Sequence, residues 1–237
     1  MQLRWLMPYI NWGISVACFL VQLTISVSSG MIAGQLANDF GLNSISLAVL
    51  MGMVFYPNIC LQIPAGMITD RFGAKRVLSI GSLVCSAGAY GFAHAQSFFT
   101  ACVFRFMMGS GLSFAFVSMA YLIANWMRRE SFSTMFALAE MIALSFTILA
   151  MKYLARVLPT SSWRDFIMLV CYTAFSLSII VSLFVKDRPD YLDDTHDPLK
   201  FSDILVQLKG FMKDYKMWAN GIYSGLLFAC LSCFVAQ

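Results

Sequence analysis

The fold of this chain is decided by one short charged stretch, which reads Gln62-Ile-Pro64-Ala-Gly66-Met-Ile-Thr-Asp70-Arg71-Phe-Gly73-Ala-Lys75-Arg76. Its charged residues separate two long runs that contain no Asp, Glu, Lys or Arg, at residues 40–69 and 77–104. Gly73 permits the tight chain reversal that a short loop between such runs requires. The stretch therefore predicts two antiparallel apolar helices that are joined by a short charged loop.

The composition of the whole chain indicates the solvent around such helices. Hydrophobic residues make up 59% of the 237 residues and charged residues 12%, whereas soluble domains contain about 25% charged residues. The mean hydropathy is +0.74. A globular core cannot bury this much apolar surface, so lipid must surround much of the chain. Disordered chains, collagen-like repeats, coiled coils and small disulfide scaffolds are excluded.

The gaps between charges predict an all-α membrane protein with seven spans, because a transmembrane helix needs about 20 apolar residues. The predicted spans are 8–31, 45–68, 77–94, 98–124, 132–154, 166–185 and 217–237. We expect residues 1–185 to form a six-helix bundle and residues 186–216 a cytoplasmic linker. Residues 217–237 would be a seventh, truncated helix that begins a missing second bundle. The second half of the linker has the spacing of an amphipathic helix, either on the membrane face or in a soluble linker.

Lysine and arginine predict the orientation of these spans. With the N-terminus in the cytoplasm, twelve of these cations lie on the inner side and three on the outer side. This asymmetry is the positive-inside pattern of multi-pass membrane proteins. The net charge of +4 is therefore explained by topology and by contact with anionic lipid, and no nucleic-acid partner is expected.

The opening stretch resembles the signature G-x-x-x-D-R-x-G-x-[KR]-[KR] of the major facilitator superfamily. The matching residues are Gly66, Asp70, Arg71, Gly73, Lys75 and Arg76. The resemblance implies a transporter of two six-helix bundles, each built from inverted three-helix repeats, in a bacterial inner membrane. It also implies that this loop latches the two bundles together on the cytoplasmic side.

The residues of the loop have their own chemistry beside the resemblance. Gly66 allows a close approach of the second span to a neighbouring helix. Asp70 is placed to pair with Arg71, or with a cation or helix terminus of the facing bundle. Lys75 and Arg76 are suited to anchor on lipid phosphate, and the alternative is that they only enforce topology.

A second resemblance lies in the fourth span, where Arg105, Gly109 and Gly111 are similar to the family pattern R-x-x-x-G-x-G. Arg105 would lie about 7–10 Å below the outer surface at 1.5 Å per residue. A charge inside a membrane span is costly and indicates a functional site, and the alternative is an arginine that snorkels to the headgroups. We expect the two glycines to serve helix packing.

Glu140 is the only acid inside a predicted span, about 12 Å from the inner end of the fifth helix. An ion pair with Arg105, a proton-carrying carboxyl and a substrate ligand are all open roles for it. Gln22, Tyr56 and Asn58 are further polar candidates for the wall of a cavity. Each of these three side chains can instead form a helix–helix hydrogen bond.

These features predict secondary active transport of a small polar solute, such as an amino acid or an organic anion, by alternating access. Proton coupling through Glu140 is one form of this hypothesis. The fifth span contains no Gly or Pro between Ser131 and Leu158, unlike drug–proton antiporters of the superfamily, and the stretch from Tyr56 to Gly66 is more similar to nutrient-uptake members.

No catalytic triad, zinc pattern or phosphate loop is present, so no enzyme, metal or cofactor is expected. One bundle offers half a cavity wall, so a second six-helix bundle would be needed for transport. The alternative is a truncated, non-transporting membrane half that binds a partner or is degraded.

Overall fold

The computed structural model describes residues 3–157 and 161–188 and, beyond them, residues 215, 218, 219, 222, 223 and 226. The chain divides into two units, residues 1–193 and 194–237. The helices of the first unit are α1 (Leu3–Phe40), α2 (Ser44–Gly52), α3 (Phe55–Phe72), α4 (Ala74–Ala93), α5 (Phe98–Trp126), α6 (Phe132–Val157) and α7 (Trp163–Phe184), with a 3₁₀ turn at Arg129–Ser131. The six further residues are helical.

Six segments of the described residues are long and apolar enough to cross a membrane. They correspond to the first six predicted spans, and the prediction of an all-α membrane fold is confirmed. The predicted linker 186–216 and seventh span 217–237 lie, apart from residues 186–188 and the six helical residues, outside the described part of the chain.

The second span is not the continuous helix that the apolar run predicted. α2 ends at Gly52 and α3 begins at Phe55, and the Met53 amide donates to the carbonyl oxygens of Val49 and Leu50 at 3.1 and 3.4 Å. Pro57 then lies in the first turn of α3, the part of a helix where a residue without an amide hydrogen is tolerated. The break therefore places a new helix start just before the proline.

The first helix is longer than predicted, because it continues past residue 31 to Phe40. Its last turns carry Gln35 and Asp39, whose side chains bind the start of α7, as described below. The polar residues that ended the apolar run thus remain helical because they have partners in the tertiary structure.

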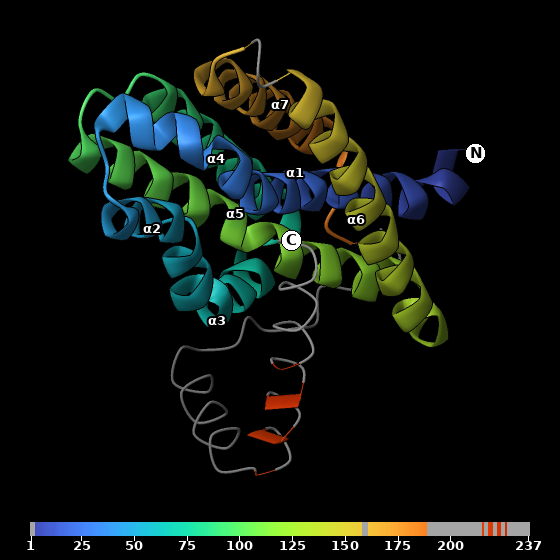
Figure 1. The fold of residues 1–237 in the computed structure, drawn as a ribbon. Helices are drawn as coiled ribbons and strands as arrows, with labels where there is room; N and C mark the ends of the chain where they lie inside the picture. The colour runs from blue at the N-terminus through green and yellow to red at the C-terminus, as the bar shows by residue number, and fades with distance from the viewer. Residues whose placement is uncertain are drawn as a thin grey trace. The chain divides into compact units, whose positions relative to one another are not determined.

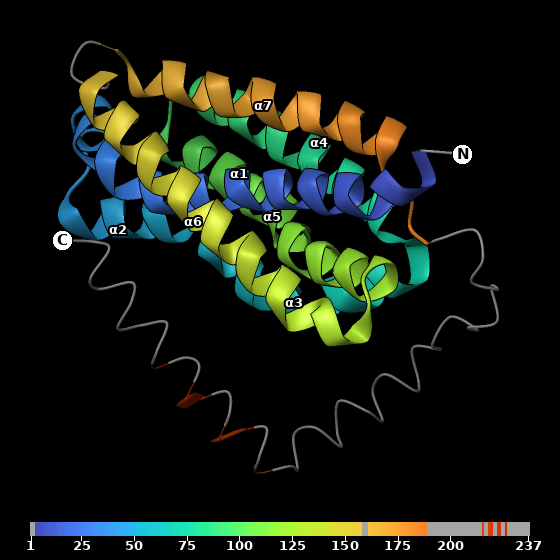
Figure 2. The ribbon, with the colours of Figure 1, turned by 90° about the vertical axis from the view of Figure 1, so that its right-hand side faces the viewer.

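α5 is the central helix of the first unit and packs against α1, α3 and α4. α4 also packs along α7, and α6 packs against α1. Figure 2 shows α1, α4, α5 and α7 running side by side, with α6 crossing α1 at an angle; Figure 1 shows the same helices from another side. α3 and α4 both pack on α5 and make few contacts with each other.

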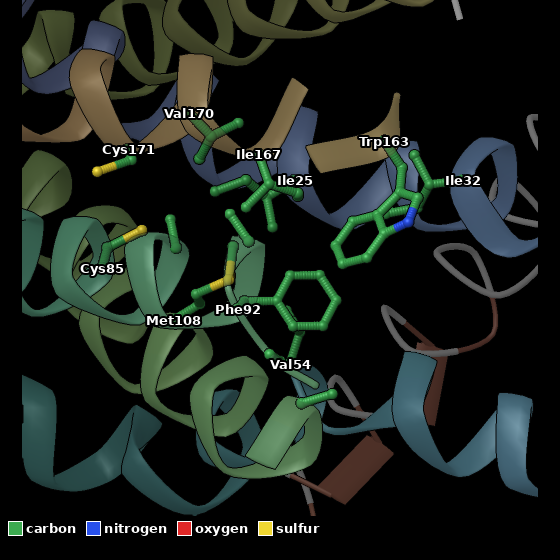
Figure 3. Close-up of a cluster of buried hydrophobic side chains, with 14 of the residues drawn as sticks. Ile25, Ile32, Val54, Cys85, Phe92, Met108, Trp163, Ile167, Val170 and Cys171 are labelled. Atoms are coloured by element: carbon green, nitrogen blue, oxygen red, sulfur yellow. The ribbon is translucent and has the colours of Figure 1, made fainter. Parts of the chain in front are cut away.

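The core between these helices contains side chains that are almost completely buried, including Ile25, Phe92, Met108 and Trp163. Figure 3 shows Phe92 and Met108 between the side chains of α7 and the turn that carries Val54. Where α4 crosses α5, a Cβ atom on Gly111 would overlap the backbone of α4. The close approach of these two helices therefore depends on glycine.

Candidate functional site

The turn between α3 and α4 consists of Gly73 alone. Its φ of 82° and ψ of 152° lie in a region that is nearly restricted to glycine. The amide of Gly73 donates to the Thr69 carbonyl at 2.9 Å and closes the last turn of α3. A single residue thus reverses the chain direction between two membrane helices.

The carboxylate of Asp187 lies directly against this turn. Its Oδ1 accepts a hydrogen bond from the Lys75 amide at 2.6 Å, in the first turn of α4. A Cβ atom on Gly73 would lie 2.7 Å from the same Oδ1 and closer still to Oδ2. A glycine is therefore required at position 73 for two reasons. Its backbone conformation is unfavourable for other residues, and a side chain would overlap the carboxylate of Asp187.

Residues 186–188, which follow α7, are held by the rest of the unit and are called the linker anchor below. The buried amide of Asn11 donates to the Lys186 carbonyl and accepts from the Lys186 amide, both at 3.2 Å. The indole of Trp126 also donates to the Lys186 carbonyl, at 2.9 Å. The linker anchor thus joins the start of α1 and the end of α5 to the signature stretch around Gly73 (residues 66–76), which is called the motif loop below.

Arg188 extends this network toward Asp70 of the motif. Its Nε donates to the Tyr121 hydroxyl at 3.2 Å. Partial burial raises the pKa of the Asp70 carboxyl above its ordinary value, and the positive charge of Arg188 acts in the opposite direction. The cation that influences Asp70 here comes from its own bundle, an arrangement that the loop sequence did not suggest.

The remaining residues of the motif are placed as follows. A Cβ atom on Gly66 would lie 3.9 Å from the Val117 side chain, so α3 meets α5 at this position. The guanidinium of Arg71 lies over the Phe72 ring at 5.5 Å, and Arg76 is exposed. The latch to a facing bundle stays a prediction.

Arg105 is buried among α1, α2 and α4, with 1% of its surface exposed. Its guanidinium donates to the Ser29 hydroxyl, lies 4.0 Å from the Met51 sulfur, and stands over the Phe92 ring at 5.1 Å. Its Nε has no hydrogen-bond partner. The side chain therefore does not snorkel to the surface, and no acid contacts it among the described residues.

Glu140 lies half-buried on α6, and no hydrogen bond or ion pair joins its carboxylate within the described part of the chain. It lies about 12 Å along α6 from the end of the bundle that carries the motif loop, and Arg105 lies about 31 Å from the same end along α5. The structure separates the two charges by about 20 Å along the helix axes and does not bring them together.

Gln22, Tyr56 and Asn58 gather at the break between α2 and α3. The Gln22 amide donates to the Asn58 side chain at 3.4 Å, and Asn58 in turn donates to the Val54 carbonyl at 3.4 Å. The Tyr56 side chain is exposed. A Cβ atom on Gly109 would overlap the Val54 carbonyl, so α5 supports the break from the other side.

An ion-pair cluster at the opposite end of the bundle was missed by sequence reasoning. One oxygen of Asp39 accepts from the Trp163 indole at 2.8 Å and from Arg164 at 2.5 Å. The Trp163 amide donates to the Gln35 side chain at 2.7 Å. These groups are more than 120 positions apart in the chain, and no local pattern pairs them.

Two of the grooves between the described helices have volumes of several hundred Å³. One, of about 370 Å³, lies between α1, α6 and α7 and is lined by residues such as Thr24, Tyr153 and Asp165. The other, of about 480 Å³, lies between α3, α4 and α5. Arg105, Glu140, Gln22, Tyr56 and Asn58 line neither groove, so the predicted cavity residues lie at helix contacts or on open helix faces of this unit.

Comparison with known proteins places these features in a family. A model described as Major Facilitator Superfamily matches residues 14–237. The chain is 21% identical over 178 residues to the probable sulfoacetate transporter SauU of Cupriavidus necator, covering 75% of this chain and 41% of that protein. It is 29% identical over 119 residues to the 4-hydroxybenzoate transporter PcaK of Acinetobacter baylyi, covering 49% and 26%.

The fold is similar to a crystal structure of a bacterial homolog to the human lysosomal transporter Spinster, in an inward-facing and unoccupied conformation. The TM-score is 0.63 at 16% identity, over 91% of this chain and 50% of that one. The chain thus spans half or less of the length of these relatives. Together with the match of the family model, this shows that the chain belongs to the major facilitator superfamily of membrane transporters, and not to an enzyme family.

Proposed function

We propose that this chain forms one half of the path of a secondary active transporter that moves a small organic anion by alternating access. The observation that carries the proposal is the buried guanidinium of Arg105. Its contacts are a hydroxyl, a thioether and an aromatic ring, and none of these groups carries a negative charge.

A buried cation without a counter-ion is costly, and such groups in membrane spans typically mark a solute or ion pathway. A bound carboxylate or sulfonate would compensate the charge of Arg105 and give its unpartnered Nε an acceptor. The names of the two relatives support this class of solute, because sulfoacetate and 4-hydroxybenzoate are both organic anions.

A solute reaches Arg105 in this proposal through a movement of α2. Met51, which contacts the guanidinium, lies in the last turn of α2, and the helix is interrupted two residues later. Interrupted helices are a recurrent feature of transporter binding sites. Rotation of α2 about the turn at residues 53–54 would uncover the guanidinium while α3 stays packed on α5.

Glu140 is the group that we propose for proton coupling. Its carboxylate is half-buried in a membrane-length helix and has no partner among the described residues. Such a carboxyl can take up and release a proton without first breaking an ion pair. Its distance from Arg105 supports separate roles for the two residues, with Arg105 for the anion and Glu140 for the proton.

The test measures uptake of 4-hydroxybenzoate and of sulfoacetate into proteoliposomes that contain this chain together with a second six-helix bundle, because the chain forms only one half of the proposed path. Arg105→Gln should abolish uptake, and Arg105→Lys should keep part of it because the charge remains but the planar fork is lost. Arg156→Gln, which removes an exposed cation from α6, is the matched control and should transport normally. Normal uptake by Arg105→Gln would overturn the assignment of Arg105.

The role of Glu140 is tested by comparing two transport modes. Glu140→Gln should lose uptake driven by a proton gradient and retain exchange of internal for external solute, which needs no net proton movement. Glu130→Gln, at an exposed site, should retain both. Equal loss of both modes in Glu140→Gln would refute a specific role in coupling.

A second candidate function is that of a membrane half that acts by binding another bundle. The supporting observation is α6, whose large apolar side chains at Met141, Phe146, Ile148 and Leu149 are exposed. Absence of uptake by the parent chain, together with association of copies in bilayers that Leu149→Lys disrupts, would favour this candidate. Monomeric behaviour with measurable uptake would exclude it.

A further inference from the structure

We propose that the groove between α3, α4 and α5 is a binding site for an anionic phospholipid, with an acyl chain in the groove and the headgroup phosphate on Arg76. Its volume of about 480 Å³ lies within the range of pockets that hold small molecules. The proposal concerns lipid and does not depend on the transported solute.

The groove exists because of how the three helices pack. α3 and α4 each pack on α5 but make few contacts with each other, so a furrow remains between them with α5 as its floor. Gly81 of α4 and Gly111 of α5 also line the groove, at the point where the backbones of these two helices are in close contact. The furrow therefore follows from the separation of α3 and α4, and its base is closed by the contact of α4 with α5.

The lining of the groove is suited to a hydrocarbon chain. Its walls are formed by Ile68 of α3, by Val77, Ile80 and Val84 of α4, and by Phe114 of α5. Ser110 also lines the groove, but its hydroxyl donates to the Phe106 carbonyl at 2.9 Å within α5. An acyl chain would thus meet apolar atoms and one hydroxyl that already has a partner.

The mouth of the groove, at the motif loop, is positively charged. Arg76 lines it directly, and Phe72, also in the lining, carries the guanidinium of Arg71 over its ring at 5.5 Å. Within the described residues Arg76 has no hydrogen bond or ion pair. Asp187 Oδ1 accepts a hydrogen bond from the Lys75 amide, and neither Asp187 nor Asp70 forms an ion pair with Arg76 in the described part of the chain.

A phospholipid has an apolar acyl chain and a charged headgroup, which match the apolar furrow and the positively charged mouth of the groove. The acyl chain fits the apolar furrow inside the membrane, and the phosphate fits the free cation at the membrane surface. An apolar partner helix would leave the charge of Arg76 unmatched, and a soluble anion would leave the furrow empty. Charge and apolar lining together therefore favour an anionic lipid.

The experiment measures lipids retained by the purified full chain, by native mass spectrometry, after exchange into vesicles of phosphatidylglycerol or phosphatidylcholine with identical acyl chains. The parent should retain phosphatidylglycerol about fivefold better, the effect of one cation near a lipid phosphate. Arg76→Gln should remove this preference. Arg129→Gln, an exposed cation at the same end of the bundle and outside the groove, should keep it.

The acyl-chain part of the proposal has its own variants. Val84→Trp fills the groove and should reduce retention of both lipids, whereas Leu183→Trp, at an exposed position of α7 outside the groove, should reduce neither. Protection of the buried cysteines, such as Cys85, from a thiol reagent shows that each variant is folded. Equal loss in Arg76→Gln and Arg129→Gln, or equal retention in Val84→Trp and Leu183→Trp, would overturn the proposal.

Discussion

Replacing Gly73 by alanine should destabilise the bundle, and part of the effect should depend on Asp187. Two separate costs arise from the single added methyl group. A residue with a Cβ atom that is held at φ 82° and ψ 152° lowers the stability of the fold by about 1–3 kcal/mol through backbone strain. The new atom also takes the space of the Asp187 carboxylate, which lies 2.7 Å or less away, so the carboxylate must leave the Lys75 amide.

The hydrogen bond from the Lys75 amide to Asp187 at 2.6 Å is made to a charged acceptor at the start of a helix. Hydrogen bonds to charged groups contribute about 1.5–3 kcal/mol, and Asp187 is only half-buried, so we expect about 1.5 kcal/mol. Gly73→Ala should therefore cost about 2.5–4.5 kcal/mol in total. Asp187→Ala alone should cost about 1.5 kcal/mol.

The assay follows the reaction of buried cysteines with a thiol-reactive dye as the protein unfolds in increasing detergent denaturant. Cys18, Cys85, Cys102 and Cys171 are buried in the structure, and Cys60 is exposed and reports the folded baseline. The free energy of unfolding is measured for the parent, both single variants and the double variant. This set forms a double-mutant cycle, which isolates the interaction between the two positions.

In the Asp187→Ala background, Gly73→Ala should cost only the backbone strain, about 1–3 kcal/mol. The cost of the alanine should thus fall by about 1.5 kcal/mol when the carboxylate is absent. An equal cost of Gly73→Ala in both backgrounds would refute the placement of Asp187 against the turn. No cost in either background would refute the positive φ of Gly73 as well.

Three further predictions concern other parts of the unit. The pKa of Asp70 is raised in the fold, so ionisation of its carboxyl lowers the stability of the bundle as the pH rises from about 4. Asp70→Asn should therefore raise the unfolding midpoint at pH 7. A gain of the same size at pH 3 would contradict this. Trp163→Phe removes the hydrogen bond to Asp39 and should lower the free energy of unfolding by about 1.5 kcal/mol. An unchanged midpoint in a denaturant titration would contradict this. Gly111→Ala should cost about 3 kcal/mol through overlap with α4, and Gly30→Ala, where a Cβ meets nothing, should match the parent in the same titration.

The linker anchor changes the interpretation of the motif loop. The residues of the motif loop were expected to face a second bundle. Within the first unit they already have partners in Asp187 and Arg188 of the linker anchor. Because the anchor also binds Asn11 and Trp126, α1, α4, α5 and the end of α7 meet at one point. A movement of the motif loop would therefore be transmitted to four helices of the bundle.

The membrane class, the first six spans and the family could be predicted from the sequence. The physical reason is that lipid excludes charge, so gaps between charged residues locate spans without knowledge of any tertiary contact. The tight turn at Gly73 could also be predicted, because a one-residue reversal of the chain needs a glycine whatever the tertiary contacts around it. These properties depend on residues that are close together in the chain.

Only the tertiary structure decided which side chains meet. It separated Arg105 from Glu140, joined Gln22 to Asn58, and joined Asp39 to Trp163 across 124 positions. Such pairs depend on the packing of helices against each other, and packing is set by the shape of whole helix surfaces, as at the glycines between α4 and α5. The charges were therefore visible in the sequence, whereas their partners depended on the helix contacts.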